Sequence, residues 1–277
     1  FRDLLELGRQ QRPHLYDLQI DKPVPLVTRD LRIEVKERLL HDGRVEQVID
    51  EDEVRIAVRR LRDAGVRSIA VCFLYSYVDS THEQIVQRII ADEFSDAFIS
   101  CSYEVLPEFR EFERLSTTVV NAYIGPVMAN YLERLGPELQ EAGISVHPHI
   151  NQSNGGVISF ETASRQPVRT VLSGPSSGIV GANYVAGLSG YRDTITFDMG
   201  GTSTDVSLIL DANPKRSGDA EVEGYPVKTP MLDIRAVGAG GGSIAWIDRG
   251  GHLKVGPHSA GADPGPVCYG LGNTLPT

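Results

Sequence analysis

The sequence has few cysteines and few aromatic residues. Its 277 residues include 3 cysteines and 1 tryptophan, and aromatic residues make up 7% of the chain. The cysteines, Cys72, Cys101 and Cys268, are odd in number and widely spaced. This spacing argues against a disulfide framework and against a Cys-x-x-Cys metal site, so we expect isolated, inert thiols.

The sequence also lacks a long apolar run and an excess of positive charge. No stretch is long enough to cross a bilayer, and no basic-then-apolar leader follows Phe1. The 37 acidic residues exceed the 27 basic residues and give a formal net charge of −10. This charge disfavours nucleic acid and anionic lipid as partners. We predict a soluble, cytoplasmic protein that binds neither nucleic acid nor membrane.

The length and the 41% of hydrophobic residues are sufficient for two domains, at about 150 residues per domain. The chain begins with Phe1 rather than Met and stops at Thr277 without a closing element. We therefore expect an internal fragment with two incomplete parts, residues 1–190 and residues 191–277.

The first part alternates predicted helices with predicted strands, which is typical of an α/β layer. The predicted helices cover 50–62, 80–94 with Ser80 as its cap, Pro107 to about Glu141 with a break near Gly125-Pro126, and 176–186. The predicted strands cover 66–75, 97–102, 144–150 and 168–172.

The second part is rich in β-forming residues. Residues 194–197 and 206–210 predict a hairpin around the turn Asp198–Asp205, and further strands are expected over 234–237 and 244–247. Residues 256–270 are rich in glycine and proline and predict a loop.

The turn Asp198–Asp205 is the most informative segment. Its glycines allow a tight fold in which backbone amides face an anion, and its threonines add hydroxyl donors. Its carboxylates suit Mg²⁺, whereas a plain hairpin turn does not require this combination. The predicted phosphate-binding residues are Gly200, Gly201, Thr202, Ser203 and Thr204; the predicted catalytic carboxylates are Asp198, which also holds Mg²⁺ through water, and Asp205.

A second glycine-rich run begins at Gly238. It resembles the start of a dinucleotide-binding fingerprint, but Ser243 stands in place of the last glycine and a strand follows instead of a helix. A dinucleotide fold is therefore disfavoured. Two interpretations remain open for this run: its backbone approaches a nucleotide closely, or it is a plain flexible loop. The residues concerned are Gly240, Gly241, Gly242 and Ser243.

The segment Gly174–Gly178 matches the G-x-S-x-G pattern of a hydrolase nucleophile elbow, with Ser176 as the nucleophile. However, Pro175 stiffens the turn, and the later chain does not supply the βα units that would carry the acid and His252 or His258. The alternative is a helix N-terminus whose amides bind an anion.

For two further groups of residues, the sequence favours a structural role over a metal-binding or substrate-binding one. His147 and His149 would share one side of a strand, but no third metal ligand is visible nearby. The acidic residues Glu104, Glu108, Glu111 and Glu113 with Arg114 are typical of a solvated helix start, with a substrate-facing cluster as the alternative.

Several segments together resemble the hydantoinase A/5-oxoprolinase family, which includes the related β subunits of acetone and acetophenone carboxylases. The similarity covers nearly the whole chain. Its main segments are 173–182, 198–205, 238–243 and 255–270, and the supporting segments are 70–83, 104–114 and 152–156.

The resemblance implies an α/β fold of the actin-like ATPase superfamily, in which two ribonuclease-H-like domains with mixed sheets and flanking helices close over ATP. It implies ATP and Mg²⁺ as cofactors, with Asp198–Thr204 as the second phosphate-binding hairpin and Gly240–Ser243 near the nucleotide. The implied partner is a hydantoinase B-type subunit or a fused domain, in a homo- or hetero-oligomer. The residues implied at the substrate or between domains are Asn154, Gly155, Gly156, Ser173 and Gly174.

The resemblance further implies that ATP phosphorylates the oxygen of a cyclic amide before ring opening. Two alternatives remain: a carboxylase β subunit that phosphorylates a ketone enolate or bicarbonate, and a non-catalytic, nucleotide-gated assembly subunit. The family's first phosphate motif has no counterpart before residue 198, so we expect little or no activity from these 277 residues alone.

Overall fold

The computed structural model describes residues 1–12 and 14–277. Their contacts define two compact units. Unit 1 contains 1–150, 157–171 and 218–230, and unit 2 contains 151–156, 172–217 and 231–277. The boundary between residues 190 and 191, as a division between two domains of a whole protein, stays a prediction.

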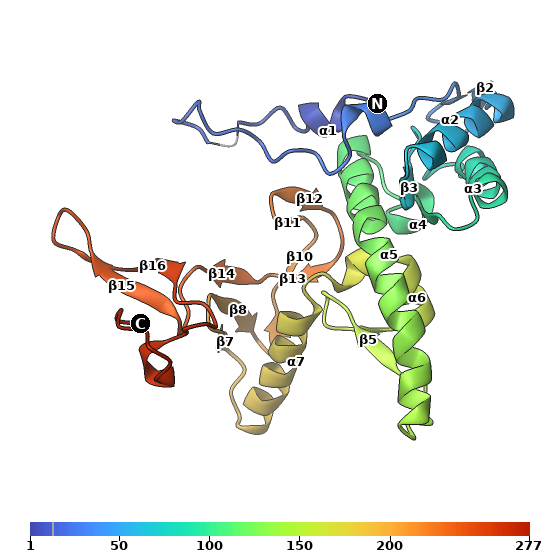
Figure 1. The fold of residues 1–277 in the computed structure, drawn as a ribbon. Coiled ribbons are helices and arrows are strands. Elements are labelled where there is room, and N and C mark those ends of the chain that lie inside the picture. Colours follow the sequence, from blue (N-terminus) through green and yellow to red (C-terminus); the bar gives the residue numbers. More distant parts are fainter. Residues whose placement is uncertain (13) are drawn as a thin grey trace. The chain divides into compact units, whose positions relative to one another are not determined.

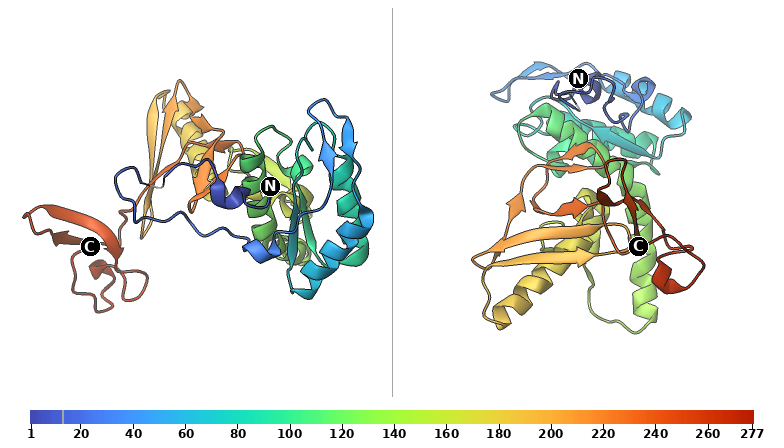
Figure 2. Two further views of the ribbon diagram at one scale, coloured as in Figure 1. Left: turned by 90° about the horizontal axis from the view of Figure 1, so that it is seen from above. Right: turned by 90° about the vertical axis from the view of Figure 1, so that its left-hand side faces the viewer.

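Unit 1 is built on a parallel pair of strands, β3 (Ser68–Val71) and β4 (Phe98–Cys101). Helices α2 (Glu51–Asp63) and α3 (Thr81–Glu93) lie on one side of these strands, and the long helix α5 (Glu111–Glu141) lies on the other (Figures 1 and 2). Parallel strands are stable when both faces are covered. The predicted α/β layer is therefore present.

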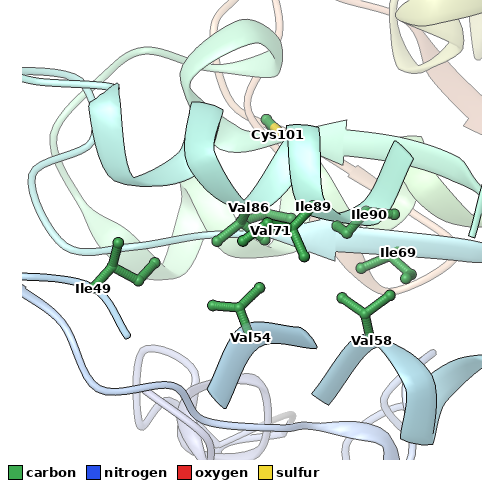
Figure 3. Close-up of a cluster of buried hydrophobic side chains, with 9 residues drawn as sticks. All are labelled: Ile49, Val54, Val58, Ile69, Val71, Val86, Ile89, Ile90 and Cys101. Carbon is green, nitrogen blue, oxygen red and sulfur yellow. The ribbon is translucent and has the colours of Figure 1, made fainter. Parts of the chain in front are cut away.

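The core of unit 1 forms where α2 and α3 meet β3. Nine buried residues pack together there (Figure 3). Val54 and Val58 of α2, spaced by one helical turn, share one face of that helix, while Ile69 and Val71 share one face of β3. The remaining members are Ile49, Val86, Ile89, Ile90 and Cys101.

The caps of the two covering helices differ from each other. The Asp50 carboxylate accepts hydrogen bonds from the N–H groups of Asp52 and Glu53 and caps α2. Ser80 makes no such bond at the start of α3; instead the Asp79 carboxylate accepts one from the Thr81 N–H at 2.8 Å. Ser80 thus occupies the predicted cap position of α3, but its hydroxyl does not make a capping hydrogen bond.

Short elements complete unit 1. The helices are α1 (Leu4–Leu7), α4 (Ser102–Val105) and α6 (Phe160–Arg165), with 3-10 turns η1 (Arg29–Leu31) and η2 (Pro167–Thr170). The strand pairs are β1 (Arg38–Leu39) with β2 (Val45–Gln47), β5 (His149–Asn151) with β6 (Val157–Ser159), and β11 (Ala220–Val222) with β12 (Tyr225–Val227).

Helix α5 differs from the prediction at both its start and its middle. It begins at Glu111 rather than Pro107, and it continues through Pro126 without a break. A proline costs the helix one backbone hydrogen bond, but tight packing holds the turn in place. A Cβ at Gly125 would lie 2.1 Å from the Phe98 ring, so this glycine lets α5 approach β4 closely.

Two predicted strands are wrong or displaced. Residues 167–170 form the 3-10 turn η2, because the Val168 N–H donates to the Asn121 side chain at 3.1 Å instead of to a strand. The strand predicted over 144–150 is reduced to β5, since Pro148 has no N–H for a ladder.

Unit 2 contains a small antiparallel sheet covered by helix α7 (Ser173–Leu188). The sheet has the order β14-β8-β7, with β9 paired to β8. The predicted hairpin is confirmed as β7 (Thr194–Met199) and β8 (Thr204–Leu210). Ile179, Ile209 and Leu232 form a small buried cluster in this unit.

The other elements of unit 2 are short strands and one turn. They are β9 (Asn213–Pro214), β10 (Arg216–Ser217), β13 (Met231–Leu232), β14 (Arg235–Val237), β15 (Ser243–Ile247), β16 (Leu253–Ser259) and η3 (Val267–Tyr269). β15 and β16 form an antiparallel hairpin, seen in orange and red in Figure 2. The predicted loop over 256–270 therefore begins with strand residues. No helix among residues 1–12 and 14–277 is both long and apolar enough to span a bilayer.

Candidate functional site

Two carboxylates face each other where the β7–β8 hairpin turns. Asp198 of β7 is opposite Asp205 of β8 in the strand register. Residues opposite each other in antiparallel strands extend their side chains to the same face. Neither carboxylate has a hydrogen bond or an ion pair with any residue that the structure describes. Because like charges in this position repel each other, the pair favours a cation.

The turn between these carboxylates presents backbone donors. The Gly200 N–H donates to the Ser203 carbonyl at 2.9 Å and closes the turn. The amides of Gly201, Thr202 and Ser203 have no acceptor within the described part of the chain, and the first two residues are exposed. Successive free N–H groups form a concave donor surface that attracts an anion.

The second glycine-rich run packs directly on this turn, backbone against backbone. The Gly241 N–H donates to the Gly200 carbonyl at 2.9 Å, and the Gly242 N–H donates to the Gly201 carbonyl at 2.6 Å. The Gly240 N–H donates to the buried Ser243 hydroxyl at 2.8 Å. The structure thus joins the two predicted glycine segments, 198–205 and 238–243, into one assembly.

The fit between these segments leaves no space for a side chain at Gly240. A Cβ there would lie 2.7 Å from the Gly200 carbonyl oxygen and 2.8 Å from the Ser203 nitrogen. At Gly241 the nearest atom would be the same carbonyl oxygen at 3.8 Å, an ordinary contact. Gly240 therefore permits the close approach, whereas Gly241 has room for a methyl group.

Thr204 has a structural contact that the sequence analysis did not foresee. Its hydroxyl donates to the Ala239 carbonyl at 2.6 Å, and the residue is buried. Its one proton is therefore used to hold the glycine loop against the hairpin. Donation from Thr204 to a phosphate would require this bond to break.

A groove of about 600 Å³ runs between α7 and the β7–β8 hairpin. Its lining includes Gly178 and Ala182 of α7, Thr196 of β7, and both Asp198 and Asp205. A Cβ at Gly178 would lie 4.0 Å from the Asp198 carboxylate. The small residues of α7 therefore leave space beside the facing carboxylates.

The loop 152–156 lies against the start of α7. The Asn154 side chain accepts a hydrogen bond from the Gly156 N–H at 2.8 Å, and Gly155 has a φ of +83° with Val180 close by. The Leu172 N–H donates to the Ser153 hydroxyl at 3.2 Å. Asn154, Gly155 and Gly156 are thus brought near Ser173 and Gly174, and their predicted substrate or interdomain role stays a prediction.

Ser176 is not a nucleophile in this structure. It is fully buried within the first turn of α7, and its hydroxyl donates to the Ser153 carbonyl at 2.8 Å. The element before it is the 3-10 turn η2 rather than a strand. Both features contradict a nucleophile elbow.

The histidine pair also fails to form a metal site. His147 precedes β5 and His149 lies within it, so the two residues do not share a strand. The residues described contain no group of three or more histidine, cysteine, aspartate or glutamate side chains placed to hold a metal ion.

A second polar cluster lies at the carboxyl ends of β3 and β4, and sequence analysis missed its centre. The fully buried Glu83 carboxylate accepts hydrogen bonds from the Phe73 N–H at 2.8 Å, the Ser102 hydroxyl at 2.6 Å and the Tyr103 N–H at 3.0 Å. Burial raises the pKa of Glu83. Burial, followed by the nearby Glu83 charge, raises the pKa of Cys72 to about 12, so this thiol is inert as predicted.

The overall structure is similar to those of two solved enzymes. The ATP-dependent caprolactamase from Pseudomonas jessenii has a TM-score of 0.85 at 37% identity, over 100% of this chain and 40% of that chain. Nucleotide-free acetone carboxylase has a TM-score of 0.80 at 28% identity, over 100% and 40% of the respective chains. The chain therefore has the predicted α/β fold of the actin-like ATPase class.

Within that class, sequence comparison identifies the family. The sequence profile described as hydantoinase/oxoprolinase matches residues 114–277, and the profile of the hydantoinase/oxoprolinase N-terminal region matches residues 1–94. The chain belongs to the hydantoinase/oxoprolinase family, as the resemblance predicted.

Relatives of this chain include hydrolases and a carboxylase subunit. The caprolactamase alpha subunit of Pseudomonas jessenii is 38% identical over 99% of this chain and 39% of its own length. The acetophenone carboxylase gamma subunit of Aromatoleum aromaticum is 37% identical over 93% and 36%. The 5-oxoprolinase of Saccharomyces cerevisiae is 35% identical over 99% and 23%. The chain thus spans less than half the length of each of these relatives.

Proposed function

We propose that this chain is part of an enzyme that uses ATP to open a cyclic amide. The observation that carries the proposal is the β7–β8 turn, where unpaired Asp198 and Asp205 flank three free backbone amides. Facing carboxylates suit a divalent cation, and free amides suit phosphate oxygens. Both kinds of group are needed to hold Mg²⁺ and ATP together.

Each residue of the turn has a distinct role in this proposal. Asp198 orients Mg²⁺ through a bound water, and Asp205 adds the second carboxylate on the same face. The amides of Gly201, Thr202 and Ser203 donate to phosphate oxygens, and the exposed Thr202 hydroxyl supplies a further donor. Thr204 holds the turn in place instead, because its hydroxyl already donates a hydrogen bond to the Ala239 carbonyl.

ATP supplies a phosphoryl group that makes the amide oxygen a leaving group, which overcomes the poor reactivity of an unstrained lactam. The chain's contribution is positioning and charge compensation, the main protein contributions to phosphoryl transfer. The rigid backbone contact between the turn and the glycine loop keeps the amides oriented before the ligand arrives, which lowers the cost of reorganisation. Caprolactamase and 5-oxoprolinase among the relatives support a cyclic amide as substrate.

The test is made on the whole protein from which this chain comes. We expect a lactam or hydantoin to stimulate ADP release, and Asp198→Asn to abolish that stimulation while circular dichroism stays unchanged. Asp92→Asn is the control, because Asp92 is an exposed carboxylate on α3 and its replacement removes the same charge. Full turnover by Asp198→Asn would refute the role of Asp198.

The second candidate is a ketone carboxylase subunit. The structural similarity to acetone carboxylase and the sequence similarity to an acetophenone carboxylase subunit favour it. Bicarbonate separates the two reactions: ATP turnover that requires bicarbonate and a ketone supports the carboxylase, and turnover with a lactam alone supports the hydrolase.

We also propose a partner subunit or a fused domain and a cytoplasmic location. The names of the caprolactamase alpha and acetophenone carboxylase gamma subunits indicate multi-subunit enzymes, and this supports a partner. If nucleotide changed association with the partner while no substrate stimulated hydrolysis, the chain would instead be a nucleotide-gated assembly subunit.

A further inference from the structure

A groove of about 490 Å³ runs along strand β3 in unit 1. Residues 66–74, an unbroken run that includes the whole of β3, line this groove. Successive side chains of a strand point to opposite faces of the sheet, so an unbroken run lines one groove where the groove follows the edge of the strand. The groove therefore lies beside the edge of β3 and not on one of its faces.

This edge of β3 is unpaired. β3 pairs with β4, and the part of the chain that the structure describes contains no second strand beside it. The Phe98 N–H donates to the Arg67 carbonyl at 3.0 Å. In the parallel register, Arg67 and every second residue after it thus direct their backbone groups to β4, whereas Ser68 and Ala70 direct theirs away from it. Unpaired backbone groups along an edge are a template for a further strand.

The groove lies in the same layer as β3 and β4. Helix α2 covers one face of β3 and helix α5 covers the other (Figure 1). Both helices also line the groove, through Val54, Val58 and Leu61 of α2 and through Leu115, Val119 and Tyr123 of α5. The walls are therefore mainly apolar, and they stand on the two sides of the position that the next strand of this sheet would take.

The chemistry of the groove selects an extended chain. A helix uses its backbone groups within itself, so it would leave the edge of β3 unpaired. A β-strand can pair with Ser68 and Ala70 through its backbone, while its alternating side chains pack on the α2 side and on the α5 side. An open apolar edge is also a site of aggregation, so a stable protein needs it covered permanently.

The rest of the whole protein can supply this strand. The chain spans 39% of the caprolactamase alpha subunit and 36% of the acetophenone carboxylase gamma subunit, so more than half the length of a protein of that size lies outside residues 1–277. A strand in the same polypeptide has a high effective concentration at β3. A strand from a second molecule would be lost on dilution, and its cover would not be permanent.

We propose that a β-strand from the part of the whole protein outside residues 1–277 adds to the free edge of β3. It exchanges backbone hydrogen bonds with Ser68 and Ala70, and its two faces pack against α2 and α5. The β7–β8 turn has no part in this pairing. The proposed function can therefore fail while this proposal holds, and the reverse is also true.

Residue-resolved hydrogen–deuterium exchange on the whole wild-type protein, without nucleotide, tests the pairing. We expect the amides of Ser68 and Ala70 to exchange as slowly as those of Ile69 and Val71, which β4 already protects. An open edge gives an alternating pattern instead. In that pattern Ser68 and Ala70 exchange roughly 100-fold faster or more, because unpaired amides open at almost no free-energy cost. Such an alternation would overturn the proposal.

Photocrosslinking of the whole protein tests the source of the strand. Tyr123 lines the groove and is 63% exposed, so Tyr123→p-benzoylphenylalanine places a probe there. We expect the probe to capture a peptide from outside residues 1–277 of the same polypeptide. The control is Tyr131→p-benzoylphenylalanine, because Tyr131 is an exposed tyrosine of the same helix that does not line the groove. It should not capture that peptide.

Three crosslinking results would overturn the proposal: capture of a second copy or of another subunit, capture within residues 1–277 alone, and capture of the same peptide by both probes. The first of these would make the edge of β3 an interface between molecules. The exchange experiment uses the unaltered protein, so it decides the pairing even where a probe variant does not fold.

Discussion

The two units are held together in different ways, unit 1 mainly by side chains and the turn of unit 2 mainly by backbone contacts. Unit 1 relies on side chains: nine apolar residues form one buried cluster, and buried Glu83 and Arg114 tie strand ends to helices. Unit 2 has a buried cluster of three residues, and its β7–β8 turn is held by backbone contacts between two glycine segments. Unit 1 should therefore be sensitive to lost volume, whereas the turn in unit 2 should be sensitive to a single added atom.

The largest expected effect is on the core of unit 1. Ile89→Ala removes a fully buried side chain, and a truncation of this kind costs about 2–5 kcal/mol of unfolding free energy through lost burial and the cavity left behind. Chemical denaturation measures the loss. Ile56→Ala on α2, at a site that is 67% exposed, is the matched control and should have little effect. Equal losses in the two variants would contradict the assignment of this core.

The next effect breaks the backbone fit of unit 2. Gly240→Ala forces a Cβ against the turn, and displacement of a preorganised site by about 1 Å can cost roughly 100-fold in rate. ADP release by the whole protein measures this. Gly241→Ala adds the same methyl group where there is room and should stay near the wild-type rate. If both variants were equally active, the contact between the two segments would not matter for function.

A smaller effect is expected at Thr204. Thr204→Val removes the hydroxyl that donates to the part-buried Ala239 carbonyl, and the loss of one such hydrogen bond costs about 0.5–1.5 kcal/mol. Because the turn loosens, the KM for ATP should rise more than kcat falls. Thr204→Ser keeps the hydroxyl and should restore KM. A Thr204→Ser variant as impaired as Thr204→Val would point to the methyl group instead.

The smallest effect concerns pH and the surface of unit 1. Hydrogen bonds from Arg59 and then Arg55 lower the pKa of Glu93 to about 2, from an ordinary value of 4.5. A carboxylate with a lowered pKa stabilises the folded state above its unfolded pKa, and this contribution disappears as pH falls from 4.5 towards about 2.

Denaturation midpoints measured across this pH range test the assignment of Glu93. Glu93→Gln should lose stability near neutral pH and show a shallower decline in acid, whereas Glu133→Gln, at an exposed site on α5, should follow the wild type. If stability fell with acid in the same way in the wild type and in Glu93→Gln, the Glu93 carboxylate would not contribute to folding stability.

Elements with a strong local signal could be predicted from the sequence. The apolar spacing and acidic first turn of α2 and the alternation around Asp198–Asp205 gave the helix and the hairpin nearly to the residue. The continuity of α5 through Pro126 could not be predicted, because the packing of Phe98 on Gly125 offsets the lost hydrogen bond. The strand predicted over 168–172 was wrong because the Asn121 side chain, distant in sequence, accepts the hydrogen bond of the Val168 N–H.

The same distinction between local signals and long-range contacts applies to the candidate site. The facing carboxylates and free amides follow from neighbouring residues, so their chemistry was visible in the sequence. The contact of Gly240 with Gly200 and the bond from Thr204 to Ala239 join segments that are remote in the chain. Glu83 ends a segment that resembles the family, but the sequence did not predict its burial, because it stands in a polar stretch of helix and only the fold places it between two strand ends.

The central claim is that the backbone of the β7–β8 turn holds the phosphates of ATP. Hydrogen–deuterium exchange of the whole protein, with and without MgATP, tests it most directly. We expect slower exchange in peptides covering 198–205 and 238–243, and no change there in Asp198→Asn. ATP turnover by the wild type with unchanged exchange in both peptides would contradict the claim.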